Sequence, residues 1–84
     1  MENNYAVIFT YSFSSETPVY LFPSEDSAVK FLRERFEEEV RIDAEESEWD
    51  CEHYISEDGW YARITTSFDD GDDIMEMRVG VIYQ

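Results

Sequence analysis

Residues 60–83 read WYARITTSFDDGDDIMEMRVGVIY, and their pattern sets the architecture of the chain. Apolar and polar side chains alternate on both sides of the turn formed by Asp69, Asp70, Gly71, Asp72 and Asp73, which is typical of strands with one buried face. The positions expected on the inner face are Trp60, Ala62, Ile64, Thr66 and Phe68, followed by Met75, Met77, Val79, Val81 and Tyr83. The segment therefore predicts a β-hairpin with one apolar face.

The N-terminal segment predicts a second hairpin. Residues 5–13 alternate Tyr, Val, Phe, Tyr and Phe against smaller or more polar residues, which indicates another half-buried strand. A turn over 14–18 then leads into a short strand over 19–22, and Pro23 ends it.

One helix is expected between the hairpins. Ser24 suits the N-cap, and Glu25 and Asp26 meet the positive end of the helix dipole. An apolar stripe on the helix consists of Ala28, Val29, Leu32, Phe36 and Val40. If the helix continued with the same periodicity, Asp43 would lie within this stripe. Because an unpaired buried carboxylate is costly, the helix is expected to end near Arg41 or Ile42.

Residues 43–58 carry many carboxylates and no Lys or Arg, so they are interpreted as an acidic connector that docks through its aromatic residues. Core packing is the expected role of Trp49 and Tyr54, with anchoring of a partner as the alternative. The whole chain, 1–84, then forms a single α+β domain in the order ββα, connector, ββ. Its antiparallel sheet has four or five strands, one helix packs on one face, and the other face is mostly solvated.

The charge of the chain excludes several functions. Twenty-one Asp and Glu residues against six Lys and Arg give a net charge of −15, which repels nucleic acid phosphates and anionic lipid. The 43% hydrophobic and 17% aromatic content nevertheless predicts a folded protein. The lone Cys51 cannot form an internal disulfide, and the N-terminal residues lack the features of a signal peptide, so a cytoplasmic location is expected.

No motif in the sequence points to catalysis. Cys51 and His53 lack the further Cys or His of a zinc site, and their acidic neighbours oppose thiolate formation. Asp69, Asp70, Asp72 and Asp73 do not have the spacing of an EF-hand, so we interpret them as a solvated turn. We expect no catalytic residue, metal or cofactor. A hydrolase centred on Cys51 and His53 is kept as a third hypothesis.

The predicted topology gathers acidic residues at one end of the molecule. If the hairpins, helix and connector alternate in direction, Glu16, Asp43, Glu45, Glu46 and the turn over 69–73 share that end, which we call the acidic pole. Like charges gathered in this way repel one another, and a basic partner would relieve that repulsion. The competing explanation is that acidity serves only solubility.

The segments from Tyr20-Leu21-Phe22 to Phe31-Leu32 and from Gly59-Trp60-Tyr61 to Tyr83 resemble short, acidic, uncharacterised proteins of gut bacteria and their mobile elements. Small phage-encoded inhibitors, including anti-CRISPR proteins, are similar in size and charge. Such inhibitors occupy the nucleic-acid groove of an effector. The resemblance implies an inhibitory binding role and supplies no site residues.

The sequence therefore predicts a non-enzymatic protein that binds the basic surface of another protein, as a nucleic-acid mimic or inhibitor. The partner-binding residues expected are Asp43, Glu45, Glu46, Glu48, Asp50 and Glu52, with Asp69, Asp70, Asp72 and Asp73 as a second cluster. The alternative is a small structural or regulatory domain that self-associates through strand edges or exposed aromatic surface.

Overall fold

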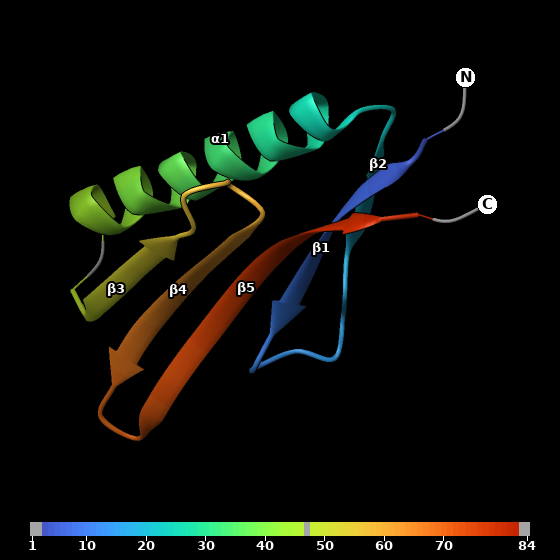
Figure 1. Ribbon diagram of the computed structural model, residues 1–84. Helices are drawn as coiled ribbons and strands as arrows, with labels where there is room; N and C mark the ends of the chain where they lie inside the picture. The colour runs from blue at the N-terminus through green and yellow to red at the C-terminus, as the bar shows by residue number, and fades with distance from the viewer. Residues whose placement is uncertain (1–2, 47, 83–84) are drawn as a thin grey trace.

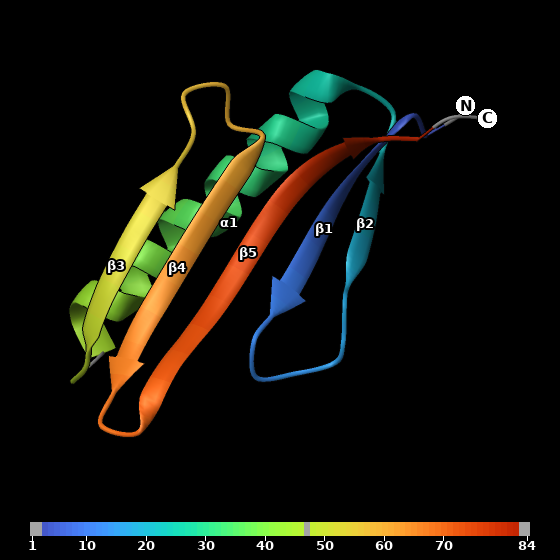
Figure 2. The ribbon, with the colours of Figure 1, turned by 60° about the horizontal axis from the view of Figure 1, so that its bottom comes forward.

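The computed structural model describes residues 3–46 and 48–82. It contains β1 (Tyr5–Tyr11), β2 (Val19–Phe22), α1 (Glu25–Glu46), β3 (Asp50–Ile55), β4 (Tyr61–Phe68) and β5 (Gly71–Val81). The strands form one antiparallel sheet in the order β2-β1-β5-β4-β3, and α1 lies across one face of it (Figures 1 and 2). The predicted α+β class is confirmed, with five strands in the sheet.

The two hairpins join through β1 and β5, the strands that are first and last in sequence. Val7 lies opposite Val79, and Phe9 lies opposite Met77. These side chains meet α1 on the inner face of the sheet, by which we mean the face that α1 covers. The buried core consists of Val7, Phe9, Ala28, Leu32, Ala62, Ile64, Met77 and Val79.

The start of the helix matches the sequence prediction. The Ser24 hydroxyl accepts a hydrogen bond from the Ser27 backbone N–H at 3.2 Å, while the Ser27 hydroxyl lies 3.4 Å from the Ser24 nitrogen. Glu25 and Asp26 occupy the first turn. The helix therefore begins where its first free N–H groups find acceptors.

The end of the helix corrects the prediction. Helix α1 runs on through Asp43 to Glu46, because the Asp43 carboxylate is paired. Its Oδ2 lies 2.8 Å from Nε2 of His53 on β3, and the two side chains are only 19% and 24% exposed respectively. The cost that was expected to stop the helix is thus offset by a partner from the neighbouring strand.

The predicted connector over 43–58 is also largely wrong. Its first residues belong to α1, and residues 50–55 form the edge strand β3, which pairs with β4 from Asp50 opposite Ser67 to Ile55 opposite Ala62. Neither Trp49 nor Tyr54 is a core residue, since both side chains are substantially exposed. Much of the acidic segment therefore lies on α1 and β3.

In the first hairpin, β1 ends at Tyr11, two residues before Phe13, where the strand was predicted to end. Phe13 follows the strand and is 60% exposed. Val81 is likewise more exposed than predicted, and Tyr83 lies outside the described residues. The residues predicted on the inner face are buried in the middle of the sheet and become more exposed toward its ends.

The pairing between Asp43 and His53 gives a testable prediction. Asp43→Ala and His53→Ala should each lower the free energy of unfolding by about 1 kcal/mol, because each removes a partly covered hydrogen bond that holds α1 to β3. The double variant should lose less than the sum of the single losses, as measured by urea unfolding. Strictly additive losses would show that the two side chains do not stabilise each other.

Candidate functional site

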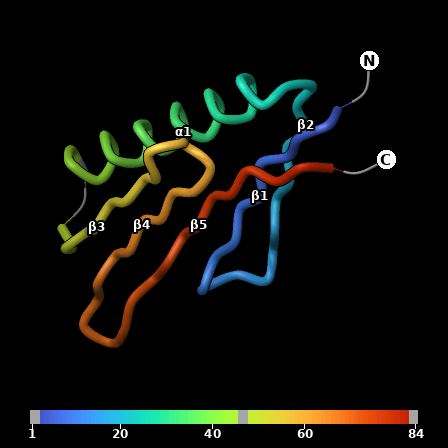
Figure 3. Tube along the Cα trace, viewed as in Figure 1, coloured from blue at the N-terminus to red at the C-terminus, as the bar shows by residue number. Residues whose placement is uncertain are grey.

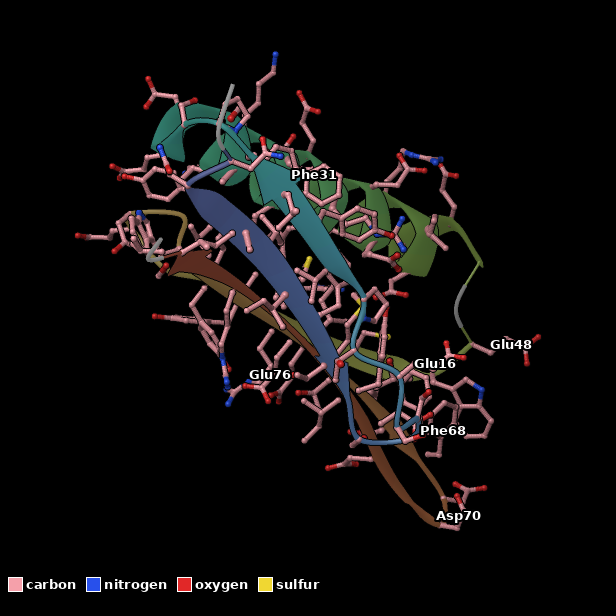
Figure 4. The ribbon with its side chains drawn as sticks, turned by 90° about the vertical axis from the view of Figure 1, so that its right-hand side faces the viewer. Glu16, Phe31, Glu48, Phe68, Asp70 and Glu76 are labelled. Carbon is pink, nitrogen blue, oxygen red and sulfur yellow. The ribbon has the colours of Figure 1, made fainter. Side chains whose placement is uncertain are left out.

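The strand directions bring four separate segments to one end of the molecule. These are the β1–β2 connection, the C-terminal end of α1, the start of β3 and the β4–β5 turn (Figures 1 and 3). Figure 4 shows Glu16, Glu48 and Asp70 at this end, with Phe31 and Glu76 away from it. The acidic pole thus draws carboxylates from segments far apart in sequence.

The first predicted cluster is divided by the structure. Asp43 faces the sheet and is bonded to His53, so it is a structural residue. Glu45 is exposed and pairs with Arg41 at 3.0 Å, whereas the side chain of Glu46 lies outside the described part of the structure. Glu48, Asp50 and Glu52 are exposed at the start of β3 and along it. These three residues form the part of the cluster best placed to meet a partner.

The second cluster lies beside the first. Asp69 and Asp70 form the exposed turn between β4 and β5, and Asp72 follows on the outer face, the sheet face away from α1. Asp50 and Asp72 both lie opposite Ser67, one on each side of β4. Two strand spacings, about 9.6 Å, therefore separate their backbones. Asp73 points to the inner face and is half-buried.

The carboxylates of β3 are arranged along a line. Asp50 and Glu52 stand two residues apart on the outer face, a separation of about 6.6 Å along a strand. The sequence has no Lys or Arg between Arg41 and Arg63, or between Arg63 and Arg78. The pole therefore has an uncompensated negative charge held on a fixed backbone.

Aromatic side chains lie beside these carboxylates. The sequence pattern placed Phe13 and Phe68 on the buried faces of their strands and did not predict that they would lie at the pole. The rings of Trp49 and Phe68 pack at 5.0 Å between centroids, and Trp49 remains 44% exposed. Phe13 packs on Tyr11 at 5.2 Å. Figure 4 places Phe68 at the same end as Glu16 and Glu48. The pole thus combines exposed ring surface with negative charge.

Away from the pole, the outer face carries a polar cluster of its own. The Tyr61 hydroxyl donates to Oε2 of Glu76 at 2.5 Å, and Arg78 donates to the same oxygen at 2.8 Å while its guanidinium lies 5.5 Å from the centre of the Tyr61 ring. The hydrogen bond from Tyr61, and then Arg78, hold the pKa of Glu76 below its ordinary value of 4.5. The same bond raises the pKa of Tyr61 above 10.0.

These pKa directions predict a pH-dependent contribution to stability. Because the pKa of Glu76 is lowered in the folded state, its stabilisation is present above pH 4.5 and is lost as the pH falls through the lower folded-state value. Tyr61→Phe should therefore cost about 1 kcal/mol at neutral pH and less near pH 3, as measured by urea unfolding at both pH values. An equal cost at both pH values would contradict the assignment.

Cys51 and His53 have separate partners. The Cys51 sulfur donates to the Trp49 carbonyl at 3.6 Å and lies 3.7 Å from the Thr66 hydroxyl, whereas His53 is bonded to Asp43. Across residues 3–46 and 48–82, no group of three His, Cys, Asp or Glu side chains is arranged to hold a metal ion, and no pocket is found. No helix within these ranges has the length and apolar character needed to span a membrane.

Comparisons of the chain with protein-family models, with curated proteins and with solved structures found no match.

Proposed function

We propose that this chain is a non-enzymatic acidic protein that binds a basic surface of another protein through its acidic pole, as a mimic of nucleic acid. The observation that carries the proposal is the gathering of Glu16, Glu48, Asp50, Asp69 and Asp70 at one end, from three different connections of the fold. A uniform acidic coat would serve solubility equally well without concentrating repulsion.

Four of the six Lys and Arg residues pair with nearby glutamates. On α1, Lys30 pairs with Glu34, Arg35 pairs with Glu39, and Arg41 pairs with Glu38 and Glu45. On the outer face, Arg78 pairs with Glu76. Because these cations are matched locally by glutamates, little of their charge is left to offset the carboxylates of the pole.

The support for mimicry comes from two neighbouring groups of carboxylates rather than from the spacing along β3 alone. A strand of B-DNA carries one phosphate per about 3.4 Å of helix axis, which is denser than the spacing of about 6.6 Å along β3. One row of carboxylates is too sparse by itself. The β4–β5 hairpin contributes a second group beside the first, with the backbones of Asp50 and Asp72 about 9.6 Å apart across the sheet.

Neutralising part of the pole tests this function. A variant with Glu48→Gln, Asp50→Asn and Glu52→Gln should retain less than about a tenth of the wild-type binding to nucleic-acid-binding proteins, and wild-type binding should weaken steeply from about 50 to about 500 mM NaCl. Proteins recovered from host lysate are identified by mass spectrometry, then purified and titrated, with duplex DNA as competitor.

The matched control removes the same charge from α1, with Asp26→Asn, Glu34→Gln and Glu37→Gln, all at exposed positions. It should bind nearly as the wild type does. Equal losses in both variants would show that only net charge matters, and binding that is insensitive to salt would overturn the proposal.

A second candidate function is self-association through β2. This edge strand exposes Val19, Tyr20 and Leu21, and no charged residue lies between Glu16 and Glu25. A neutral edge strand can pair with another strand. Light scattering should then detect a dimer that persists or increases with salt and is lost in Leu21→Lys, whereas a monomer at every salt concentration would exclude it.

A further inference from the structure

We infer that the acidic pole selects arginine over lysine on its partner, because exposed aromatic rings and carboxylates lie together there. The inference rests on the proposed function and specifies the chemistry of the partner. It is carried by Trp49 and Phe68, whose rings pack together at the β4–β5 end of the sheet, and by Phe13, which follows β1 and is 60% exposed. The β4–β5 hairpin extends past the helix in Figures 1 and 3.

The register of the strands fixes where these rings lie. Phe68 is opposite Gly71 at the β4–β5 turn, and Trp49 packs against it from the start of β3. The backbone N–H of Ser12 donates to the Ile74 carbonyl, which holds the segment just before Phe13 against β5. The three aromatic residues therefore lie at the same end of the sheet.

Carboxylates lie beside this aromatic surface. Glu48 precedes Trp49 and Asp69 follows Phe68 in the chain, and Asp73 lies on the inner face near Phe68. A purely apolar partner would cover the rings but remove water from these carboxylates without giving them a donor, which is unfavourable. An anionic partner would be repelled. A cation with a flat, weakly hydrated surface satisfies both the rings and the carboxylates.

The guanidinium group of arginine has these properties, and the lysine ammonium does not. Guanidinium stacks on aromatic rings while its N–H groups donate to carboxylates in two parallel bonds, whereas ammonium is a compact and strongly hydrated charge. The partner surface is therefore expected to be rich in arginine. Its arginine side chains would insert between the aromatic rings and the neighbouring carboxylates.

The protein itself uses this combination twice. Arg78 lies over the Tyr61 ring at 5.5 Å while it donates to Glu76 at 2.8 Å. Arg35 lies over the Phe9 ring at 5.7 Å and pairs with Glu39 at 3.1 Å. In both cases one arginine engages a ring and a carboxylate together, which is the arrangement inferred for the pole.

Two labelled peptides of equal length and charge, one of arginine and one of lysine, test the inference by fluorescence anisotropy at fixed salt. The wild-type protein should bind the arginine peptide roughly fivefold more tightly. Trp49→Ala and Phe13→Ala should each reduce that ratio toward one. Tyr54→Ala is the matched control, because it removes an exposed aromatic residue from the outer face of β3, and it should keep the ratio.

The outcomes separate this inference from the proposed function. If both peptides bind equally and binding still weakens with salt, the pole is a simple charge surface, and the arginine preference is overturned while the proposed function stands. If the preference survives both aromatic substitutions, the rings do not recognise arginine and the inference fails. If neither peptide binds, the proposed function fails and the inference with it. Circular dichroism of each variant verifies that it is folded.

Discussion

Leu32→Ala is expected to lower the free energy of unfolding by about 3 to 4 kcal/mol, a large share of the stability of so small a domain. Leu32 has 0% exposure and lies at the centre of the core between α1 and the sheet. Its truncation removes apolar contacts and leaves a cavity that the strands cannot fill without losing their register. Urea unfolding followed by circular dichroism measures the loss.

Leu21 offers a matched control for the same chemical change. It lies on the edge strand β2 and is 54% exposed, so Leu21→Ala should cost no more than about 0.5 kcal/mol. Similar losses at both leucines would mean that the core does not lie where the packing of α1 places it.

Gly59→Ala is expected to cost about 2 kcal/mol or more, because two unfavourable effects combine at this residue. Gly59 has a φ of +74°, a backbone conformation that residues with a Cβ rarely adopt. An added Cβ would also lie 2.8 Å from Cγ1 of Val29 and 3.3 Å from the Arg33 guanidinium. The turn between β3 and β4 would have to move away from the helix.

The collision can be separated from the backbone strain with Val29→Ala. In that background the methyl group that meets the new Cβ is gone, so Gly59→Ala should cost less than it does in the wild type, by about 1 kcal/mol. Thermal or urea unfolding of the four proteins measures the coupling. If the cost is unchanged, backbone conformation alone accounts for the effect.

The parts of the fold that could be predicted are those encoded by local periodicity. The alternation of apolar and polar residues predicted both hairpins, and Ser24 as N-cap predicted the start of α1. Strand β3 was harder to recognise because its inner positions are Cys51, His53 and Ile55, of which only the last is strongly apolar. The end of α1 depended on a contact between Asp43 and a histidine ten residues later, which no local pattern reveals.

The candidate site shows the same division. Topology alone sufficed to expect Glu16 and the β4–β5 turn at one end. Other features depend on strand register and on how far α1 extends over the sheet. These are the burial of Asp43 against His53, the exposure of the Trp49 and Phe13 rings, and the hydrogen bond from Tyr61 to Glu76. Phe31, which lies away from the site (Figure 4), is a further example. Its ring centroid lies 5.0 Å from those of Tyr20 and Phe22, because the helix packs over β2.

The pairing of β1 with β5 has a consequence for how the chain folds. Tyr5 lies opposite Val81, so the central contact of the sheet closes a loop of almost the entire chain. Such non-local pairing is slow to form, whereas the two flanking hairpins close early. Until it forms, the hairpins expose unpaired edges that are able to aggregate. Mutual repulsion at a net charge of −15 opposes the association of such intermediates.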